Sequence, residues 1–324
     1  MSVMSAHIAF PAFVRSLDPD AGIEAFRPAS LSRILNIDLL RNRLGFNGLI
    51  VSDASEMAGL TAWADERDSK VQIIANGCDV ILFTREAETD MAAVLSAVQA
   101  GEITRERFED AVLRVLAMKA ALGLHRQTVI PAAKRKSQLA TQNNRSIARA
   151  ITARAPTLVK DIKNLLPISV TNHRRVLIFT TGIVSPIHPV PITFILPDLL
   201  VAEGFEVSIY TPDSQVSPGN FDLILYLFGE ETLLTRGRIF LDWAKITGNF
   251  VGAMRRYWHN TPTVMVSFGY PYYLYDAPRA PTYINAFCTT DDMQKAVLEC
   301  LIGRAAWNKH SPIDPFCGLE DAHY

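Results

Sequence analysis

One unbroken apolar run constrains the fold of this chain more than any other stretch. It is Leu49-Ile50-Val51, with Gly48 before it and Ser52-Asp53 directly after it. A short continuous apolar run predicts a fully buried strand of a parallel sheet. Asp53 then lies just past the carboxyl end of this strand, where α/β folds and barrels place their chemistry. An Asp at this position can also cap the next helix, so position alone leaves both roles open.

Strands and helices alternate on both sides of this run. Residues 3–10 predict a strand, 11–29 a loop, and Ser30 the N-cap of a helix that ends at Gly45. Beyond Asp53 the pattern predicts a strand over 78–83 and helices over 62–75, 87–99 and 104–121. Residues 1–124 therefore have the strand–helix alternation of a parallel α/β sheet.

The rest of the chain predicts a second α/β unit over residues 138–324, after a polar linker over 125–137. Its pattern predicts edge segments at 157–160 and 165–168, strands at 176–180, 205–210, 221–228 and 263–268, and helices at 138–153, 191–203, 235–258 and 290–302. This rhythm is typical of a doubly wound, flavodoxin-like domain. It contains neither GxGxxG nor GxxxxGK[ST], so nucleotide binding is unsupported.

Composition excludes several function classes. The net charge of −1 gives no reason to expect nucleic acid or an anionic membrane as a partner, and Lys134-Arg135-Lys136 is interpreted as a solvated turn. No run approaches 18 apolar residues, and the first residues lack the basic region of a signal peptide. Four cysteines without a CxxC pair predict reduced thiols and a cytoplasmic location. We expect no metal and no organic cofactor.

Short motifs resemble, in order and spacing, those of one family of carbohydrate-active enzymes. Val3-Met4-Ser5-Ala6-His7 is similar to a Val-Met-x-Ala-His strand, and Ser52-Asp53 with Met57 is similar to Ser-Asp-x-x-x-Met. Further similar segments are Pro28 to Ser32, Leu39 to Gly48, Ala75 to Asp79, Arg114 to Lys119, Thr157 to Lys160, Ser267 to Tyr272 and Thr282 to Ala286. Together they resemble glycoside hydrolase family 3.

The resemblance implies a fold. Residues 1–124 are similar to the last three strands of a (β/α)₈ barrel, and residues 138–324 to the family's α/β sandwich domain. A whole barrel needs about 250 residues. We therefore expect a partial barrel that lacks the first five strands, in a truncated chain.

The resemblance also implies site residues. Asp53 is expected to be the catalytic nucleophile of a retaining exo-β-glycosidase, most similar to the β-N-acetylhexosaminidase branch. His7 is expected to line the floor of the sugar site, or to be a hydrogen-bonded core histidine. Met57 is expected to pack beneath the sugar ring, or to make an apolar contact within its loop. Trp63 invites sugar stacking, but a core position on a helix face is the favoured interpretation.

The expected acid/base is harder to place. Retaining hydrolysis needs a nucleophile and an acid/base about 5–5.5 Å apart. The hexosaminidase branch supplies a His from a Lys-His-Phe-Pro-Gly-His loop, and this chain does not contain that motif. In the β-glucosidase branch a Glu of the second domain serves, and Glu230-Glu231 is the similar-looking candidate, although an acidic pair at a strand end can be a solvated loop. Autonomous activity is therefore doubtful. The alternative to an enzyme is a non-catalytic remnant, or a binding module of a split hydrolase.

The expected partial barrel has consequences for partners. Three parallel strands cannot close on themselves, so residues 3–10 and 78–83 are expected to be sheet edges. We expect the first unit to need a second copy, a separate amino-terminal barrel half or the second unit. A carbohydrate with a terminal β-linked sugar is the expected substrate.

Overall fold

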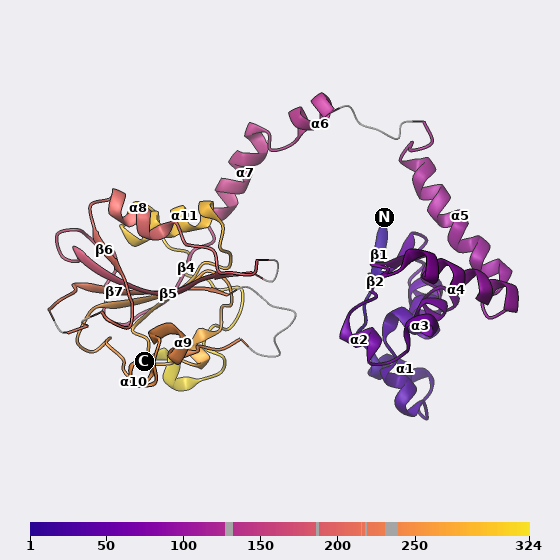
Figure 1. The fold of residues 1–324 in the computed structure, drawn as a ribbon, viewed down its shortest axis with the longest axis horizontal. Coiled ribbons are helices and arrows are strands. Elements are labelled where there is room, and N and C mark those ends of the chain that lie inside the picture. The colour runs from indigo at the N-terminus through magenta and orange to yellow at the C-terminus, as the bar shows by residue number, and fades with distance from the viewer. Residues whose placement is uncertain (127–131, 186–187, 215, 218, 231–238) are drawn as a thin grey trace. The chain divides into compact units, whose positions relative to one another are not determined.

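The chain forms two compact units, Met1–Arg135 and Lys136–Tyr324 (Figure 1). The computed structural model describes all of the 324 residues except 127–131, 186–187, 215, 218 and 231–238. The predicted linker over 125–137 falls partly on 127–131 and to that extent lies outside the described residues. The short helix α6 (Ala132–Gln138) spans the division between the units.

The first unit contains a three-stranded parallel sheet. Its strands β1 (Ser2–Ser5), β2 (Leu49–Ala54) and β3 (Val80–Leu82) lie in that order, so the predicted strand at Asp53 is the central one. Ser5 pairs with Ser52, and Val51 pairs with Val80. At Gly48 an added Cβ would lie 2.2 Å from the carbonyl oxygen of Met1, so glycine is required where β1 and β2 approach. The predicted parallel α/β class is confirmed for this unit.

Helices pack against one face of this sheet. They are α2 (Ala58–Thr61), α3 (Glu66–Ala75), α4 (Ala87–Ala100) and α5 (Arg105–Ala121). Side chains alternate along a strand, and Ile50 of β2 is fully buried among residues of this helical layer. On the neighbouring strand, Met4 pairs with Val51 on the opposite face and is 54% exposed. The second face of the sheet therefore carries apolar side chains that the helices of this unit do not cover.

The segment after β1 differs from the prediction. The strand ends at Ser5, because the carbonyls of Ala6 and Ile8 accept hydrogen bonds from Ser30 and Ala29 instead of continuing a ladder. Pro11 was expected to break structure but begins a helix, α1 (Pro11–Leu17). Proline is tolerated at the first helical position because its missing N–H has no intrahelical acceptor there.

Three further sequence predictions for this unit are wrong in detail. Ser30 does not cap a long α-helix: it lies in a 3₁₀ turn (Ala29–Leu31), which is followed by a π-helix over Ile34–Arg43. The Ser32 hydroxyl instead accepts the N–H of Leu35 at 3.4 Å. The helix expected over 62–75 begins only at Glu66, as α3, because the Asp65 side chain caps it through the N–H of Asp68, and the separate helix α2 precedes it. A 3₁₀ helix also spans Gly22–Phe26.

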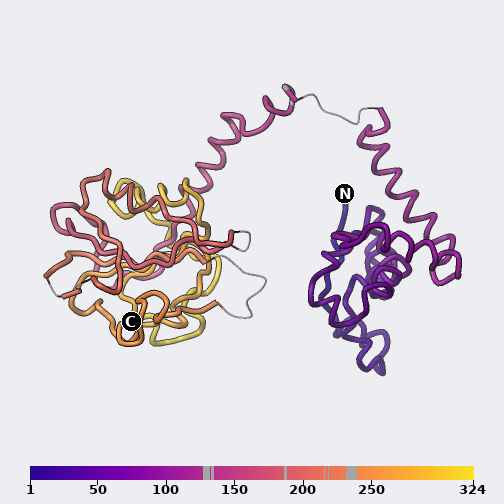
Figure 2. The backbone as a smooth tube through the Cα atoms, in the orientation of Figure 1, coloured from indigo at the N-terminus to yellow at the C-terminus, as the bar shows by residue number. Residues whose placement is uncertain are grey.

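The second unit contains a six-stranded sheet. Helix α7 (Gln142–Thr152) precedes its first strand, and the backbone between the two can be followed in Figure 2. The strands are β4 (Thr157–Asp161), β5 (Arg175–Val184), β6 (Glu206–Ile209), β7 (Leu223–Glu230), β8 (Thr263–Ser267) and β9 (Thr282–Asn285), in the order β4-β9-β8-β7-β5-β6. Among the strands of the described residues, β4 is the one that pairs antiparallel with its neighbour. The five parallel strands follow the order 2-1-3-4-5, which is that of flavodoxin-type sheets.

Helices cover both faces of this sheet (Figure 1). On one face lie α8 (Leu196–Ala202) and α11 (Asp291–Leu301), and on the other α9 (Trp243–Thr247) and α10 (Phe250–Ala253). Alternate side chains of β5 feed the two cores, Ile178 on the first and Phe179 on the second. Short 3₁₀ helices span Tyr273–Tyr275 and Glu320–His323. No helix of the described residues is long and apolar enough to cross a bilayer.

Two predictions for the second unit are corrected. Residues 165–168 do not form an edge strand, because the Asp161 carboxylate accepts the N–H groups of Leu165 and Leu166 and holds them in a turn. The helix expected over 235–258 falls partly on 231–238, outside the described residues, and the rest is broken. Gly248, with φ of 72°, ends α9, and the Asn249 side chain begins α10.

Candidate functional site

Asp53 lies at the carboxyl end of the central strand, half-buried and on the face opposite Ser52. Its Oδ1 accepts the N–H of Ala54 at 2.8 Å, and among the described residues no hydrogen bond to Oδ2 is present. The Ser52 hydroxyl accepts the N–H of Leu82 and donates to the Asp53 carbonyl, which fixes the strand end on both sides. One carboxylate oxygen is held in place, and the other is available to a ligand.

The helix-capping alternative for Asp53 is excluded. The next helix, α2, begins after Met57 and has no side-chain cap, and α3 is capped by Asp65. The Asp53 carboxylate therefore has no helix terminus to satisfy in this structure.

His7 is 8% exposed and uses both ring nitrogens within the protein. Nε2 lies 2.9 Å from the carbonyl oxygen of Ala54, and Nδ1 lies 2.7 Å from the hydroxyl of Ser30. A carbonyl only accepts, so Nε2 carries a proton and donates it. The hydrogen-bonded core interpretation of His7 is the one that this geometry favours, and the side chain connects the segment that follows β1 to Ala54, the residue after Asp53.

Met57 and Trp63 both lie in the segment that follows β2. Met57 is half-buried, and its N–H also donates to the Ala54 carbonyl, at 3.1 Å. A Cβ on Gly59 would lie 2.9 Å from the His7 carbonyl oxygen, so the turn carrying Met57 rests closely on β1's carboxyl end. Trp63 packs against the helical core with Arg27 over its ring, which supports the core interpretation of that residue.

We expect His7→Ala to lower the free energy of unfolding of the first unit by about 1–3 kcal/mol, because it leaves the buried Ser30 hydroxyl without the His7 ring nitrogen and leaves the Ala54 carbonyl with only the N–H of Met57. Denaturant unfolding of the variant measures this. Since Nε2 donates, His7→Gln should recover part of the loss. An unchanged midpoint for the alanine variant would contradict the role given to His7.

The amino end of β2 is held by a buried ion network that the sequence did not point to. The Asp79 side chain is inaccessible and contacts Arg41 at 2.7 Å and Arg107 at 2.5 Å. Asp79 also accepts the N–H of Ile50 at 2.8 Å, and Arg41 donates to the Gly48 carbonyl. Burial lowers the pKa of Arg41, against the opposing attraction of Asp79. This network fixes the strand whose other end carries Asp53.

In the second unit, Glu230 is the last residue of β7 and lies beside the carboxyl end of β5, where it pairs with Val184. With Thr181, Asp242 and Lys245 it lines a small pocket at the carboxyl ends of these two strands. In a 2-1-3-4-5 sheet this is the point where the strand order reverses, the usual place for a ligand. Glu231, the other predicted candidate, lies outside the described residues.

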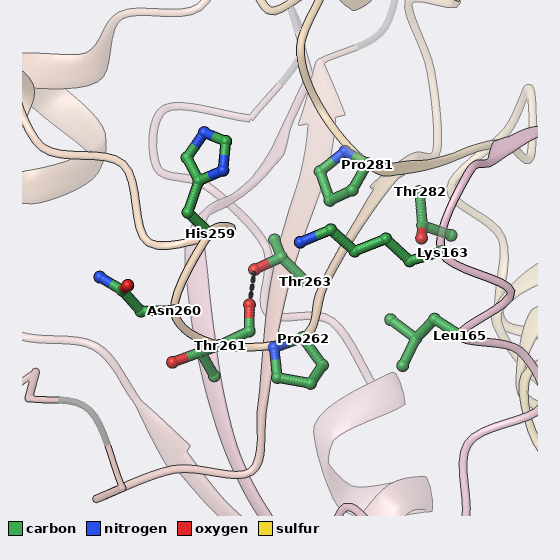
Figure 3. Close-up of a pocket in the computed structure, with 9 residues that line it drawn as sticks. All are labelled: Lys163, Leu165, His259, Asn260, Thr261, Pro262, Thr263, Pro281 and Thr282. Carbon is green, nitrogen blue, oxygen red and sulfur yellow. Dashed lines mark hydrogen bonds between the residues drawn. The ribbon is translucent and has the colours of Figure 1, made fainter. Parts of the chain in front are cut away.

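A further pocket, of about 210 Å³, lies at the opposite edge of this sheet (Figure 3). It is lined by Lys163, His259 and the segment Thr261–Thr263, where the Thr263 hydroxyl donates to the Thr261 carbonyl. Lys163 donates to the Trp258 carbonyl at 2.9 Å. The amino ends of β8 and β9 form this edge, whereas ligands of α/β sheets bind at the carboxyl ends, so the pocket is a poor candidate site. No group of three or more His, Cys, Asp or Glu side chains in the described residues could hold a metal ion.

Comparison with known proteins identifies the family. Residues 1–118 match the glycosyl hydrolase family 3 N terminal domain. The β-N-acetylglucosaminidase/β-glucosidase of Cellulomonas fimi is 37% identical to this chain over 99% of its length. The chain belongs to glycoside hydrolase family 3. As a family 3 protein it spans 59% of the length of the Cellulomonas fimi relative.

Solved structures agree with this family 3 assignment. A β-glucoside phosphorylase, BglX, bound to 2FGlc superimposes with a TM-score of 0.86 and 31% identity, over 98% of this chain and 58% of that one. A family 3 β-N-acetylglucosaminidase from Paenibacillus shares the fold, with a TM-score of 0.74 and 20% identity over 98% of this chain and 59% of its own. The predicted glycosidase family and α/β fold are confirmed.

Proposed function

We propose that the protein of which this chain is part is a retaining exo-acting β-glycosidase of the β-N-acetylhexosaminidase or β-glucosidase type. It removes terminal β-linked sugars, and Asp53 is its nucleophile. The observation that carries the proposal is the Asp53 carboxylate itself. It lies at the carboxyl end of a central parallel strand, one oxygen held by Ala54 and the other unbonded among the described residues, inside the segment that matches the family. The names of the relatives support the substrate class.

The proposed reaction has two steps. In the first, Asp53 Oδ2 attacks the anomeric carbon, the bond from that carbon to the leaving oxygen breaks, and an acid protonates the leaving oxygen. In the second, a water loses a proton to the same group and attacks the glycosyl-enzyme ester, which releases the sugar and restores the carboxylate. His7 positions the segment after Asp53 through the Ala54 carbonyl, and Met57 offers an apolar surface beside it.

Trapping tests this proposal directly. A 2-deoxy-2-fluoro glycoside with a good leaving group should form a stable ester, seen as an increase in intact mass and mapped by peptide sequencing to Asp53. An adduct on any other residue would remove Asp53 from the nucleophile role.

One observation favours phosphate, in place of water, as the molecule that attacks the glycosyl-enzyme ester in the second step. The solved relative that superimposes with a TM-score of 0.86 is a β-glucoside phosphorylase. In phosphorolysis a phosphate oxygen attacks the glycosyl-enzyme ester, and a sugar 1-phosphate leaves in place of the free sugar. Turnover in the presence and absence of inorganic phosphate distinguishes the two, because only phosphorolysis converts phosphate into sugar 1-phosphate.

If Glu230 is the acid/base, we expect the loss of rate in a Glu230 variant to depend on the leaving group of the substrate. Glu230→Gln should then cost about a hundredfold or more for poor leaving groups, which need protonation, and little in the first step for dinitrophenyl glycosides. Glu206→Gln, at the amino end of β6, is the matched control. Equal losses of rate for both leaving groups, or no loss, would mean that another residue is the acid. In that case we expect little turnover by this chain alone, because it would lack an acid/base.

A further proposal rests on the first unit's sheet. We propose that it forms the last three strands of a (β/α)₈ barrel, since β1 and β3 are edges and Met4 is exposed on the uncovered face. Its completion by a barrel half, a second copy or the second unit is tested by measuring the molar mass in solution.

The alternative to an enzyme is a non-catalytic binding module, which predicts sugar binding without a trapped ester.

A cytoplasmic location is also proposed, supported by four free cysteines.

A further inference from the structure

A pocket of about 210 Å³ lies beside the carboxyl ends of β2 and β3, and the proposed mechanism does not use it. Ser55 and Glu56, which directly follow β2, form one wall, and Phe83 and Arg85, which follow β3, form another. Helix α3 supplies the remaining wall, with Lys70 among its lining residues.

Lys70 is the unusual member of this set. It is 2% exposed, yet in the part of the chain that the structure describes its ammonium makes no hydrogen bond. Its nearest charge is Asp90 of α4, itself 6% exposed, at 3.7 Å from Nζ to Oδ2, and that Oδ2 has no hydrogen-bond partner among the described residues either. An ammonium has three donors, and the Lys70 side chain is one of those that line the pocket. The Lys70 ammonium therefore has N–H groups that it can donate to an oxygen acceptor in the pocket.

Phe83 is the second unusual member. Its φ is 55°, in the left-handed region that bulky residues avoid, and its side chain is 71% exposed. Such strain persists where the surrounding structure imposes it, and it clusters at ligand sites. The backbone is held here because the Leu82 carbonyl accepts both the N–H and the hydroxyl of Ser55. The ring offers an apolar surface at the pocket.

Charge decides the class of ligand. Lys70 is paired with Asp90, and Arg85 lies 3.7 Å from Glu56, so both cations already face a carboxylate. Asp65 and Glu66 add further negative charge to the lining. An anion such as phosphate is therefore disfavoured. A ligand that accepts from the ammonium, donates to carboxylates and presents an apolar face to an aromatic ring is an uncharged sugar.

We propose that this pocket binds a second, uncharged sugar unit, with Lys70 donating to a ring or hydroxyl oxygen and Phe83 packing against the C–H face. The inference rests on the proposed glycosidase function for its choice of substrate, because the pocket lies two residues beyond Asp53. The sugar unit bound here is distinct from the one whose anomeric carbon reacts.

The test measures binding by calorimetry with the full chain, using cellobiose, N,N′-diacetylchitobiose and inorganic phosphate as probes. Lys70→Met and Phe83→Gly should each weaken disaccharide binding about tenfold or more. Phe83→Gly relaxes the left-handed backbone, so it keeps the experiment informative if Lys70→Met fails to fold. Phe250→Ala, which removes a 75% exposed ring in the second unit, should leave affinity unchanged.

Failure of the two proposals can be told apart. Asp53→Asn should abolish trapping by the fluoro glycoside but retain disaccharide binding at the pocket. Unchanged affinity in the Lys70→Met and Phe83→Gly variants, absence of saccharide binding by the parent chain, or tighter binding of phosphate than of disaccharide would each overturn the pocket's assignment. Absence of an ester on Asp53, with binding still sensitive to Lys70, would overturn only the proposed reaction.

Discussion

Asp53→Ala is expected to slow cleavage of the glycosidic bond by at least about a thousandfold, a rise of about 4 kcal/mol or more in the barrier, because it removes the carboxylate that forms the covalent bond. The measurement is the rate of aryl glycoside cleavage, or of ester trapping, by the chain together with whatever part of the protein completes its activity. The side chain is half-buried and makes one hydrogen bond to its neighbour, so the fold should tolerate its loss.

Two controls separate chemistry from folding. Azide should rescue Asp53→Ala with an activated substrate by attacking the anomeric carbon directly, which gives a glycosyl azide of inverted configuration. Asp20→Ala, which removes an exposed carboxylate from a turn of the same unit, should leave the rate unchanged. A full rate for Asp53→Ala would mean that another group is the nucleophile.

Asp79→Ala is expected to lower the free energy of unfolding of the first unit by about 3–5 kcal/mol. It leaves the guanidinium groups of Arg41 and Arg107, whose side chains are 9% and 12% exposed, without their shared carboxylate, and it removes the acceptor of the Ile50 N–H. Breaking a buried ion pair by deleting one partner costs far more than the pair contributes when intact, because the remaining charge is uncompensated. Denaturant unfolding followed by circular dichroism measures the change.

An exposed pair in the same unit provides the comparison. Arg105 and Glu109 lie one turn apart on α5, with side chains 83% and 61% exposed. Solvent screens such a pair, so Glu109→Ala should change the unfolding free energy by about 0.5 kcal/mol or less. Similar losses for Asp79→Ala and Glu109→Ala would show that burial does not set the strength of the Asp79 network.

Much of the fold follows from local pattern. The apolar run at 49–51 predicts β2, and its position before Ser52-Asp53 places the carboxylate at the strand end, as the structure has it. Thr104 begins α5 and caps it through the N–H of Arg107, since a Ser or Thr before a helical stripe is a local signal. The predictions are wrong where a distant partner overrides local preference. The Ser30 hydroxyl bonds to the His7 ring instead of capping a helix, and the Asp161 carboxylate holds residues 165–166 in a turn.

The α/β class of both units, the motifs of glycoside hydrolase family 3 and the position of Asp53 at a strand end can be predicted from the amino-acid sequence, because they depend on periodicity and on neighbours along the chain. The hydrogen-bond partners of His7, the arginines that contact Asp79 and the contact of Lys70 with Asp90 are known only from the folded structure. The one hint of the Lys70–Asp90 contact along the sequence is that Lys70 lies on the same face of α3 as Ile73 and Ile74. Each of these contacts joins residues at least 20 positions apart, and no local pattern specifies such a partner, because the energy of a buried polar group depends on what the fold places beside it.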